Sequence, residues 1–335
     1  MADGICKGSL KPTKESNLIN GYSKSHLKSF YGETGSIYIK GRADEFDELV
    51  MDHTTGTSIS GVQRKMFMHL ENGVLMPSNN GEYIVKPTPR KFPSLSENEH
   101  AIMKLSEAVG LKTAQCSVIP FEDGEFAYIT KRFDLIPNSN VRFFIEDGAS
   151  ICNVAPKHKD SDSLSYEGVL KQMVDSCAGA QAAALIALRM LIFGYVVGNN
   201  DMHLKNFSLY RKPTNKTVTF DGFTPVYDML SVAPYKAYFG TELSLNLLKS
   251  EAEAAQYSKS YDAYGYYTFE DFYLLAQSLG ISAKAATKLI TSFVAAIDKK
   301  APSIMMNSNL PADLKQFLLE RIASKCSAMR RKIIT

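Results

Sequence analysis

The sequence has no cysteine pair with the spacing of a zinc site or of a small disulfide framework. Its five cysteines are an odd number, are scattered along 335 residues and include no Cys-x-x-Cys pair. Zinc-binding and disulfide-stabilised classes are therefore not supported, and a reducing cytoplasm is the simplest location. The net charge of +3 is also too small to indicate direct binding of nucleic acid.

The sequence also lacks a leader pattern and an uninterrupted membrane span. Residues 1–7 do not show the basic and then apolar pattern of a secretory signal peptide. The most apolar segment, residues 178–197, contains Gln181 and Arg189 and runs directly into a polar loop. We therefore interpret it as a buried helix, and we predict a cytoplasmic protein that does not bind a membrane.

The basic residues near the end of the chain are predicted to lie on one solvated helix face. They are Arg321, Lys325, Arg330, Arg331 and Lys332. A contact with an acidic partner is the alternative interpretation of this locally basic stretch.

Composition and pattern indicate an α+β protein with two lobes. A chain of 335 residues with 45% apolar residues can bury a large core. Residues 1–135 contain short strands, turns and one clear helix, and we expect them to form a nucleotide-binding N-lobe. A polar break at 134–140 follows the strand pattern of residues 126–133. Residues 136–335 are mainly helical and are expected to form the C-lobe.

Three helices are predicted in the last part of the chain. Thr268 precedes a helix that ends at Gly280, Ser282 caps a helix to about Ile297, and Pro311 begins the last one. Hydroxyl residues at the start, a glycine at the end and proline in the first turn are typical of helix boundaries.

The most informative segment of the chain is the loop at residues 198–207. It contains Asp201, four intervening residues and Asn206, and an apolar strand pattern follows it. This is the Asp-x4-Asn spacing of a protein-kinase catalytic loop, in which the Asp accepts a hydroxyl proton and the Asn holds Mg²⁺. Taken alone, the spacing also fits a polar turn closed by Asx side chains.

Three further residues stand in the order that a kinase requires. Lys86 lies at the end of a β-branched and aromatic strand pattern, where a lysine contacts the ATP phosphates. Glu99 lies in the segment Glu97-Asn98-Glu99-His100, which opens an amphipathic helix, and is placed to pair with Lys86. Asp228 ends a second apolar strand pattern, where another metal-binding carboxylate is expected. Each has an ordinary structural explanation by itself, so it is their order that favours a kinase.

A segment rich in small residues precedes the strand pattern at 66–70. Residues 56–65 read Gly-Thr-Ser-Ile-Ser-Gly-Val-Gln-Arg-Lys. Small residues let backbone N–H groups approach phosphate oxygens. The G-x-G-x-x-G pattern is absent, so the spacing alone fits a polar hairpin loop as well as a nucleotide lid.

Together these motifs resemble the HipA family of bacterial serine/threonine kinase toxins, most closely the short HipT-type members. The resemblance covers roughly residues 55 to 240. It is carried by Ser58-Ile59-Ser60-Gly61-x-Gln63-x-Lys65, Ile84-Val85-Lys86-Pro87, Glu97-Asn98-Glu99-His100, Arg132-Phe133-Asp134, Gly198 to Phe207 and Tyr227-Asp228. The Ser-Ile-Ser-Gly and Asp-x-His-x-Lys-Asn-Phe loops are not shared by kinases in general, so the resemblance is specific. It implies a two-lobed, protein-kinase-like fold in a bacterial cytoplasm.

The resemblance implies a role for each matching residue. Asp201 would be the catalytic base, and Lys205 would stabilise the transferring phosphoryl group. The implied Mg²⁺ ligands are Asn206 and Asp228. The implied ATP-binding residues are Lys86 with its partner Glu99, Ser58, Ser60, Gly61, Arg132, Phe133 and His203. For His203 a hydrogen-bonded structural role is the alternative, and Ser58 and then Ser60 are candidate autophosphorylation sites.

The resemblance also implies a substrate class and partners. Family members phosphorylate aminoacyl-tRNA synthetases to halt translation, with the tryptophanyl enzyme the first candidate here and the glutamyl enzyme the second. Longer members carry an additional N-terminal subdomain, which we expect a HipS-like small protein to supply in a HipBST-like toxin–antitoxin system. A HipB-like DNA-binding antitoxin is the second expected partner. A pseudokinase that acts as a scaffold and a kinase of small molecules are the alternatives.

Overall fold

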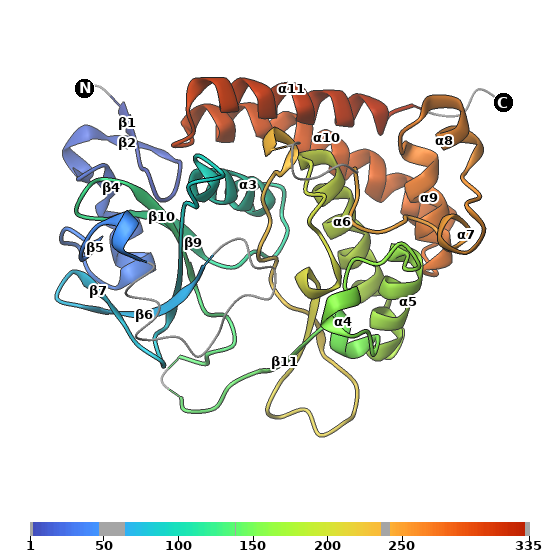
Figure 1. Cartoon of the computed structure of the whole chain (residues 1–335), viewed down its shortest axis with the longest axis horizontal. Helices are drawn as coiled ribbons and strands as arrows, with labels where there is room; N and C mark the ends of the chain where they lie inside the picture. Colours follow the sequence, from blue (N-terminus) through green and yellow to red (C-terminus); the bar gives the residue numbers. More distant parts are fainter. Residues whose placement is uncertain (1–2, 47–63, 138, 236–241, 332–335) are drawn as a thin grey trace. The chain divides into compact units, whose positions relative to one another are not determined.

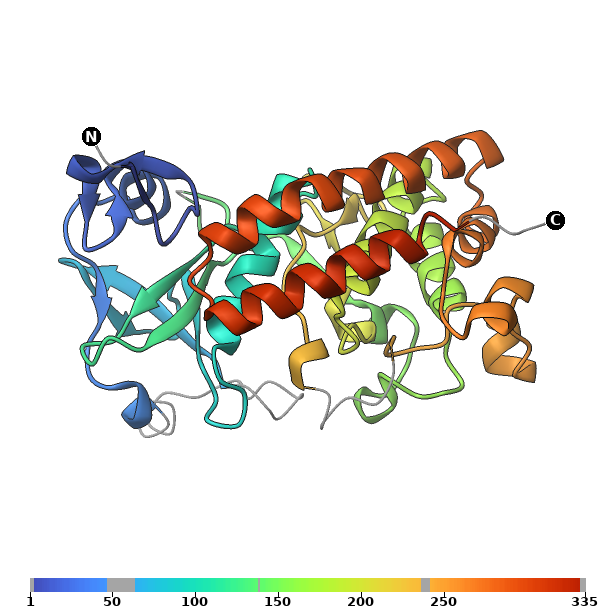
Figure 2. The same ribbon diagram turned by 90° about the horizontal axis from the view of Figure 1, so that it is seen from above.

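The computed structural model describes residues 3–46, 64–137, 139–235 and 242–331 of the chain. Helices and strands are both well represented, which confirms the α+β class. The described residues fall into two compact units (Figures 1 and 2). The first comprises Met1–Lys104, Thr113–Phe133 and Ser303–Lys315, and the second comprises Leu105–Lys112, Asp134–Pro302 and Gln316–Thr335. Neither unit is therefore contiguous in sequence.

The first unit is built on a six-stranded sheet among the described residues. In spatial order the strands are β5 (Tyr38–Ile39), β7 (Val74–Pro77), β6 (Met66–Glu71), β8 (Tyr83–Pro87), β10 (Phe126–Lys131) and β9 (Cys116–Pro120). Neighbouring strands are antiparallel, except for the parallel pair β5 and β7. In β8, Tyr83 and Val85 are buried in the core of this unit, as expected for a strand with alternate residues on one face. The strands predicted around residues 66–70 and 81–87 are confirmed.

The helix α3 (Leu95–Ala108) confirms the amphipathic helix predicted from Glu97 onward and begins two residues earlier. The chain leaves this helix at Gly110, whose φ of 82° lies in the left-handed region that glycine adopts at low cost. At the other end, the Ser96 hydroxyl donates to the Lys86 carbonyl oxygen at 3.1 Å. This bond holds the start of α3 against the end of β8.

Short elements complete the first unit. They are β1 (Asp3–Ile5), β2 (Pro12–Lys14), β3 (Leu18–Ile19), β4 (Tyr22–Ser23), α1 (Lys24–His26), a π-helical turn (Leu27–Tyr31) and 3₁₀ turns at Glu15–Asn17 and Ala43–Glu45. The side-chain amides of Asn307 and Asn309 donate to the carbonyl oxygens of Leu10 and Lys7 at 3.1 and 2.9 Å. These two bonds join residues 307–309 to residues 7–10 within the first unit.

The second unit combines helices with a small antiparallel sheet. The sheet has the order β11 (Phe144–Asp147), β12 (Ser208–Arg211) and β13 (Gly222–Phe223). The helices are α4 (Gly148–Ile151), α5 (Tyr166–Ser176), α6 (Gln181–Val197), α7 (Lys249–Ala254), α8 (Lys259–Tyr264), α9 (Phe269–Ser278) and most of α10 (Ala283–Asn307) and α11 (Ala312–Ala328). Short 3₁₀ turns lie at Pro156–His158, Leu204–Asn206 and Ala233–Tyr235.

The helix α6 forms the apolar centre of the second unit. Its residues from Leu188 to Val197 are buried apart from the half-buried Arg189, which confirms the buried helix expected for this segment. Among the helices that the structure describes, none is both long and apolar enough to span a membrane. The helix ends at Gly198 with φ 77°, and a Cβ there would lie 2.9 Å from the Cβ of Ala233. Glycine is therefore needed where the chain turns into the loop that contains Asp201.

The predicted helix boundaries in the last part of the chain are confirmed with one exception. Thr268 caps α9 by accepting from the Glu270 N–H at 3.3 Å, and α11 follows Pro311 directly. The helix α10, however, continues past Ile297 to Asn307. Ala301 and Met305 are fully buried and extend its apolar stripe beyond Ile297, so packing continues the helix.

The strand predicted to end at Asp228 is much shorter than expected. Strand β13 ends at Phe223, and the Thr224 N–H still donates to the Ser208 carbonyl oxygen at 2.9 Å. Pro225 has no N–H to donate, and Asp228 has a left-handed φ of 55°. The chain therefore reaches Asp228 as a turn rather than as a strand.

The prediction of one solvated basic helix face is wrong for Lys325. Its side chain is buried in the second unit, 2.5 Å from a carboxylate oxygen of Glu242. Arg330 also forms an ion pair, at 2.6 Å from Asp298. The positive charges predicted to face solvent are thus partly neutralised within the fold.

Candidate functional site

The first candidate site lies where β8 and α3 meet in the first unit. The Lys86 ammonium is 2.8 Å from Oε1 of Glu99, which is the pairing that the sequence predicted. The Glu99 side chain is fully buried and that of Lys86 is 11% exposed. The ring of Tyr128 lies across from Lys86 in the neighbouring strand, with its centroid 5.4 Å from the ammonium. Burial makes each charge dependent on the other, because an unpaired charge is costly in this environment.

Two further residues expected near the nucleotide lie just after β10 in the first unit. The Arg132 guanidinium stacks 4.6 Å from the centroid of Phe67 and donates to the Gly81 carbonyl oxygen at 3.3 Å. Phe133 is half-buried and is the last residue of its segment in this unit. The contacts of Arg132 join the end of β10 to β6 and to the residues just before β8.

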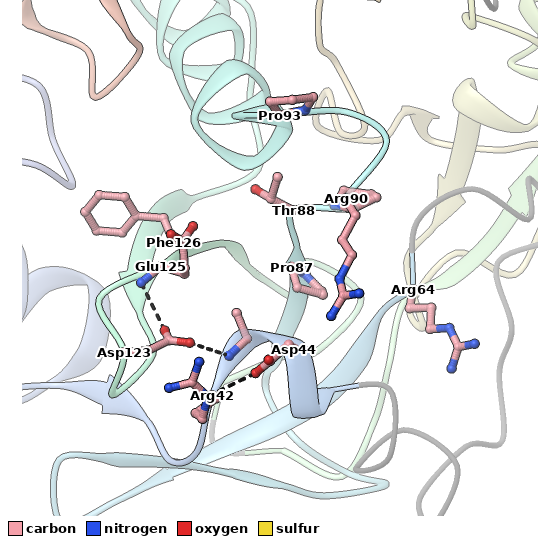
Figure 3. Close-up of a pocket in the computed structure, with 12 residues that line it drawn as sticks. Arg42, Asp44, Arg64, Pro87, Thr88, Arg90, Pro93, Asp123, Glu125 and Phe126 are labelled. Atoms are coloured by element: carbon pink, nitrogen blue, oxygen red, sulfur yellow. Dashed lines mark hydrogen bonds and ion pairs between the residues drawn. The ribbon is translucent and has the colours of Figure 1, made fainter.

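The residues expected in the nucleotide lid, Ser58, Ser60 and Gly61, lie outside the described residues. A cavity of about 750 Å³ opens beside the end of β8 in the same unit (Figure 3). Its charged lining residues are Arg42, Arg64, Arg90, Asp44, Asp123 and Glu125. Among the described lining residues, three positive and three negative side chains balance, so their charge does not assign the cavity to nucleotide phosphates.

The second candidate site is the loop that follows α6 in the second unit. The Asp201 carbonyl oxygen accepts from the backbone N–H of His203 at 2.9 Å and from the side-chain amide of Asn206 at 2.8 Å. The Tyr166 hydroxyl donates to the carbonyl oxygen of Met202 at 2.8 Å from helix α5. These bonds hold Asp201 and Asn206 in one compact turn, which is the arrangement that their spacing predicted.

His203 is buried beside Asp201, with Nε2 4.0 Å from Oδ1 of the carboxylate. Burial and the nearby Lys159 lower the pKa of His203 to about 4, against the opposing effect of Asp228. The ring is therefore neutral at pH 7, and the contact with Asp201 is not an ion pair. Neither ring nitrogen has a hydrogen-bond partner within the described part of the chain, so the hydrogen-bonded structural role considered for this residue is not observed.

Tyr227, the residue before Asp228, bonds to residues on either side of Asn206. The Tyr227 hydroxyl lies 2.8 Å from the Lys205 carbonyl oxygen and 2.6 Å from the Ser208 hydroxyl. The residue before Asp228 is thus attached to both sides of Asn206. Because the Asn206 nitrogen donates to Asp201, its amide oxygen is the atom suited to bind a cation.

A metal site made only of charged or imidazole ligands is not observed. Within the described ranges, no three or more His, Cys, Asp or Glu side chains are close enough to hold a metal ion. Asn206 and Asp228 do not belong to such a group, since they supply one amide and one carboxylate. Such oxygen ligands, completed by water and phosphate, suit Mg²⁺.

The structure adds Asp147, which the sequence patterns did not single out. The Lys205 ammonium lies 3.5 Å from Oδ2 of Asp147 in the second unit. Asp147 is the last residue of β11 and caps helix α4 by accepting from the Ser150 N–H at 3.0 Å. The only local signal for it is an acidic residue between an aromatic strand and a glycine, which is a common helix-cap pattern.

Comparisons with known proteins indicate the family of the chain. Residues 57–301 match the family model of the HipA-like C-terminal domain. A protein of Haemophilus influenzae that carries the name of a kinase is 29% identical over 327 residues, covering 92% of each chain. The serine/threonine-protein kinase toxin HipA of Shewanella oneidensis is 27% identical over 210 residues, which cover 56% of this chain and 46% of that protein.

A solved structure shows the same fold. It is the Shewanella oneidensis toxin–antitoxin complex of HipA, HipB and operator DNA, and it aligns with a TM-score of 0.66 at 18% identity. The alignment covers 86% of this chain and 71% of the solved chain. Since the family model matches most of the sequence, the chain belongs to the family of HipA-like C-terminal domains, and its relatives identify it as a HipA-like kinase.

Proposed function

We propose that the chain is an ATP- and Mg²⁺-dependent serine/threonine protein kinase that acts as the toxin of a HipBST-like toxin–antitoxin system. The observation that carries this proposal is the buried ion pair of Lys86 and Glu99 at 2.8 Å. In protein kinases, a strand lysine and a helix glutamate must form this pair before phosphoryl transfer proceeds. Its presence favours an enzyme over a pseudokinase scaffold.

In this proposal Asp201 is the proton acceptor. The hydroxyl oxygen of the protein substrate forms a bond to the γ-phosphorus of ATP while the bond from that phosphorus to the ADP oxygen breaks. The hydroxyl proton passes to the Asp201 carboxylate. Because His203 is neutral, no imidazolium lies beside this carboxylate to weaken it as a base.

Asn206 and Asp228 are the residues proposed to hold Mg²⁺. Their amide and carboxylate oxygens are of the type that Mg²⁺ prefers, and Tyr227, the residue before Asp228, bonds to the loop that contains Asn206. When bound, the ion would neutralise charge on the ATP phosphates. Lys86 is proposed to contact ATP phosphates, and Arg132, Phe133 and His203 are proposed as further nucleotide-binding residues.

The proposals for regulation and partners rest on the family resemblance. We propose Ser58 and Ser60 as autophosphorylation sites, where a phosphate adds about −1.5 to −2 charges and would oppose ATP binding. The Shewanella oneidensis HipA structure contains HipB and operator DNA, which supports a HipB-like antitoxin as one partner. A HipS-like small protein stays a prediction of the resemblance.

The proposed substrates are aminoacyl-tRNA synthetases, with the tryptophanyl enzyme first and the glutamyl enzyme second. The test is to incubate the purified chain with γ-labelled ATP, Mg²⁺ and each synthetase, beside an Asp201→Asn variant. We expect Asp201-dependent label on the tryptophanyl enzyme and on Ser58 or Ser60, located by mass spectrometry. Label on the glutamyl enzyme alone would replace the first candidate by the second.

Two other results would assign the alternatives. If no protein is labelled but a bacterial metabolite extract is, the chain is a kinase of small molecules. If nothing is labelled and expression arrests bacterial growth equally with Asp201→Asn, the chain acts as a scaffold.

A further inference from the structure

The loop that contains Asp201 contacts strand β11 through an ion pair. The Lys205 ammonium lies 3.5 Å from Oδ2 of Asp147, and the two side chains are 26% and 24% exposed. Partial burial reduces solvent screening, so this pair interacts more strongly than a fully exposed one. A lysine side chain has about 2 kcal/mol of rotamer entropy. An ion pair at its tip therefore restricts where the ammonium lies.

The Asp147 carboxylate is itself held in place. Its Oδ1 accepts from the Ser150 N–H at 3.0 Å, as the cap of helix α4. One oxygen thus fixes the rotamer while the other faces Lys205. Asp147 presents a preset negative charge rather than a mobile one.

The backbone around Asp147 is braced against the same loop. Asp147 pairs with Ser208 in the β11–β12 ladder, and the Gly148 N–H donates to the Phe207 carbonyl oxygen at 2.8 Å. A Cβ on Gly148 would lie 2.7 Å from the Leu204 carbonyl oxygen. The strand therefore approaches the turn that contains Lys205 as closely as a glycine permits.

Lys205 is fastened on its main chain as well. Its carbonyl oxygen accepts from the Tyr227 hydroxyl at 2.8 Å. The backbone of Lys205 is thus fixed by the segment of Asp228, and the side chain is directed by Asp147. Both contacts lie within the second unit.

We propose that Asp147 is a positioning residue for the kinase reaction, which holds the Lys205 ammonium ready for the transferring phosphoryl group. This inference rests on the proposed function of Lys205. Asp147 acts through Lys205 and touches neither nucleotide nor protein substrate. Preorganising a cation in this way accelerates a reaction because the charge needs no rearrangement in the transition state.

The test uses Asp147→Asn in the full chain. Asparagine caps helices as well as aspartate does, so the bond to the Ser150 N–H is retained while the charge that faces Lys205 is lost. We expect kcat for phosphorylation of the protein substrate to fall about two- to fivefold, as for loss of a partly screened ion pair, with KM for ATP and the melting temperature nearly unchanged. Glu146→Gln, the neighbouring carboxylate in β11, is the matched control and should behave as the unaltered chain.

A double-mutant cycle separates positioning from a general structural effect. If Asp147 acts through Lys205, Asp147→Asn should reduce kcat no further in a Lys205→Met background. An equal reduction in both backgrounds, or an unchanged or raised kcat in the single variant, would overturn the inference. If the unaltered chain has no kinase activity, the proposed function is wrong, and the inference about Asp147 is wrong with it.

Discussion

The Lys325 ammonium lies 2.5 and 2.6 Å from the two carboxylate oxygens of Glu242 in the second unit. It also lies 3.2 Å from the Tyr195 hydroxyl and 4.8 Å from the centroid of that ring. The Lys325 side chain is 9% exposed, whereas that of Glu242 is 39% exposed. The pair is therefore asymmetric, with a buried cation and an anion that reaches solvent.

This asymmetry predicts that Glu242→Gln destabilises the protein more than Lys325→Met. Loss of Glu242 removes the carboxylate that lies 2.5 Å from a buried ammonium, and breaking buried pairs in this way costs about 3 kcal/mol. Loss of Lys325 leaves a carboxylate that solvent and Arg321, 3.8 Å away, still stabilise. Melting temperatures and urea unfolding of both variants measure the difference, and an equal loss would contradict the asymmetry.

The Lys86–Glu99 pair predicts an activity defect with retained secondary structure in Glu99→Gln. Glutamine keeps the shape of the fully buried side chain but removes the charge that orients Lys86. If Lys86 binds ATP phosphates, phosphoryl transfer should fall roughly 100-fold, while circular dichroism remains unchanged. A Glu97→Gln variant, from the same turn of α3, is the control. Full activity of Glu99→Gln would show that phosphoryl transfer does not require this ion pair.

The close approach of Gly148 predicts that Gly148→Ala is destabilising. The added Cβ would lie 2.7 Å from the Leu204 carbonyl oxygen and 3.2 Å from Sδ of Met173, so the backbone of the loop after Asp201 must shift. We expect a loss on the order of 2 kcal/mol in the free energy of unfolding. Gly168→Ala in α5 is the control, because its Cβ would lie 3.4 Å from the Ser165 hydroxyl oxygen and alanine favours a helix. A Gly148→Ala variant with an unchanged free energy of unfolding would show that the loop shifts at little cost.

Buried histidines predict a loss of stability on acidification. His100 is fully buried in the first unit, with Nε2 2.9 Å from the Gly8 carbonyl oxygen. Burial, with a smaller effect of Lys104, lowers the pKa of His100 to about 3. Between that value and the unfolded pKa near 6.5, the unfolded chain binds a proton that the folded chain does not. The free energy of unfolding should therefore fall by about 2 kcal/mol from this residue between pH 7 and pH 5.

His100→Gln isolates this contribution. The glutamine amide keeps a donor for the Gly8 carbonyl oxygen but does not titrate in this range. Urea unfolding at pH 7 and pH 5 should show a smaller decrease for the variant than for the unaltered chain. His26 and His203, whose pKa values burial lowers to about 4, contribute to the acid sensitivity that remains. An identical decrease in the free energy of unfolding for the two proteins would show that protonation of His100 does not destabilise the fold.

Local patterns in the sequence were sufficient for the α+β class, for the family and for several contacts within the candidate sites. Strand and helix periodicity placed Lys86 and Glu99 on consecutive elements, and the structure pairs them. The Asp201 to Asn206 spacing correctly indicated one compact turn. Assignment to the HipT-type members and the roles of the site residues stay predictions.

Tertiary packing decided the contacts that no local pattern encodes. Asp147 meets Lys205, and Glu242 meets Lys325, only because separate elements fold against each other. Periods of 2 and 3.6 residues report which side of a strand or helix is apolar. They do not report which distant charge that side will meet, so Lys325 was expected to face solvent and Asp147 was not singled out. Sequence determined the chemistry available to this protein, and packing determined which charges are buried together.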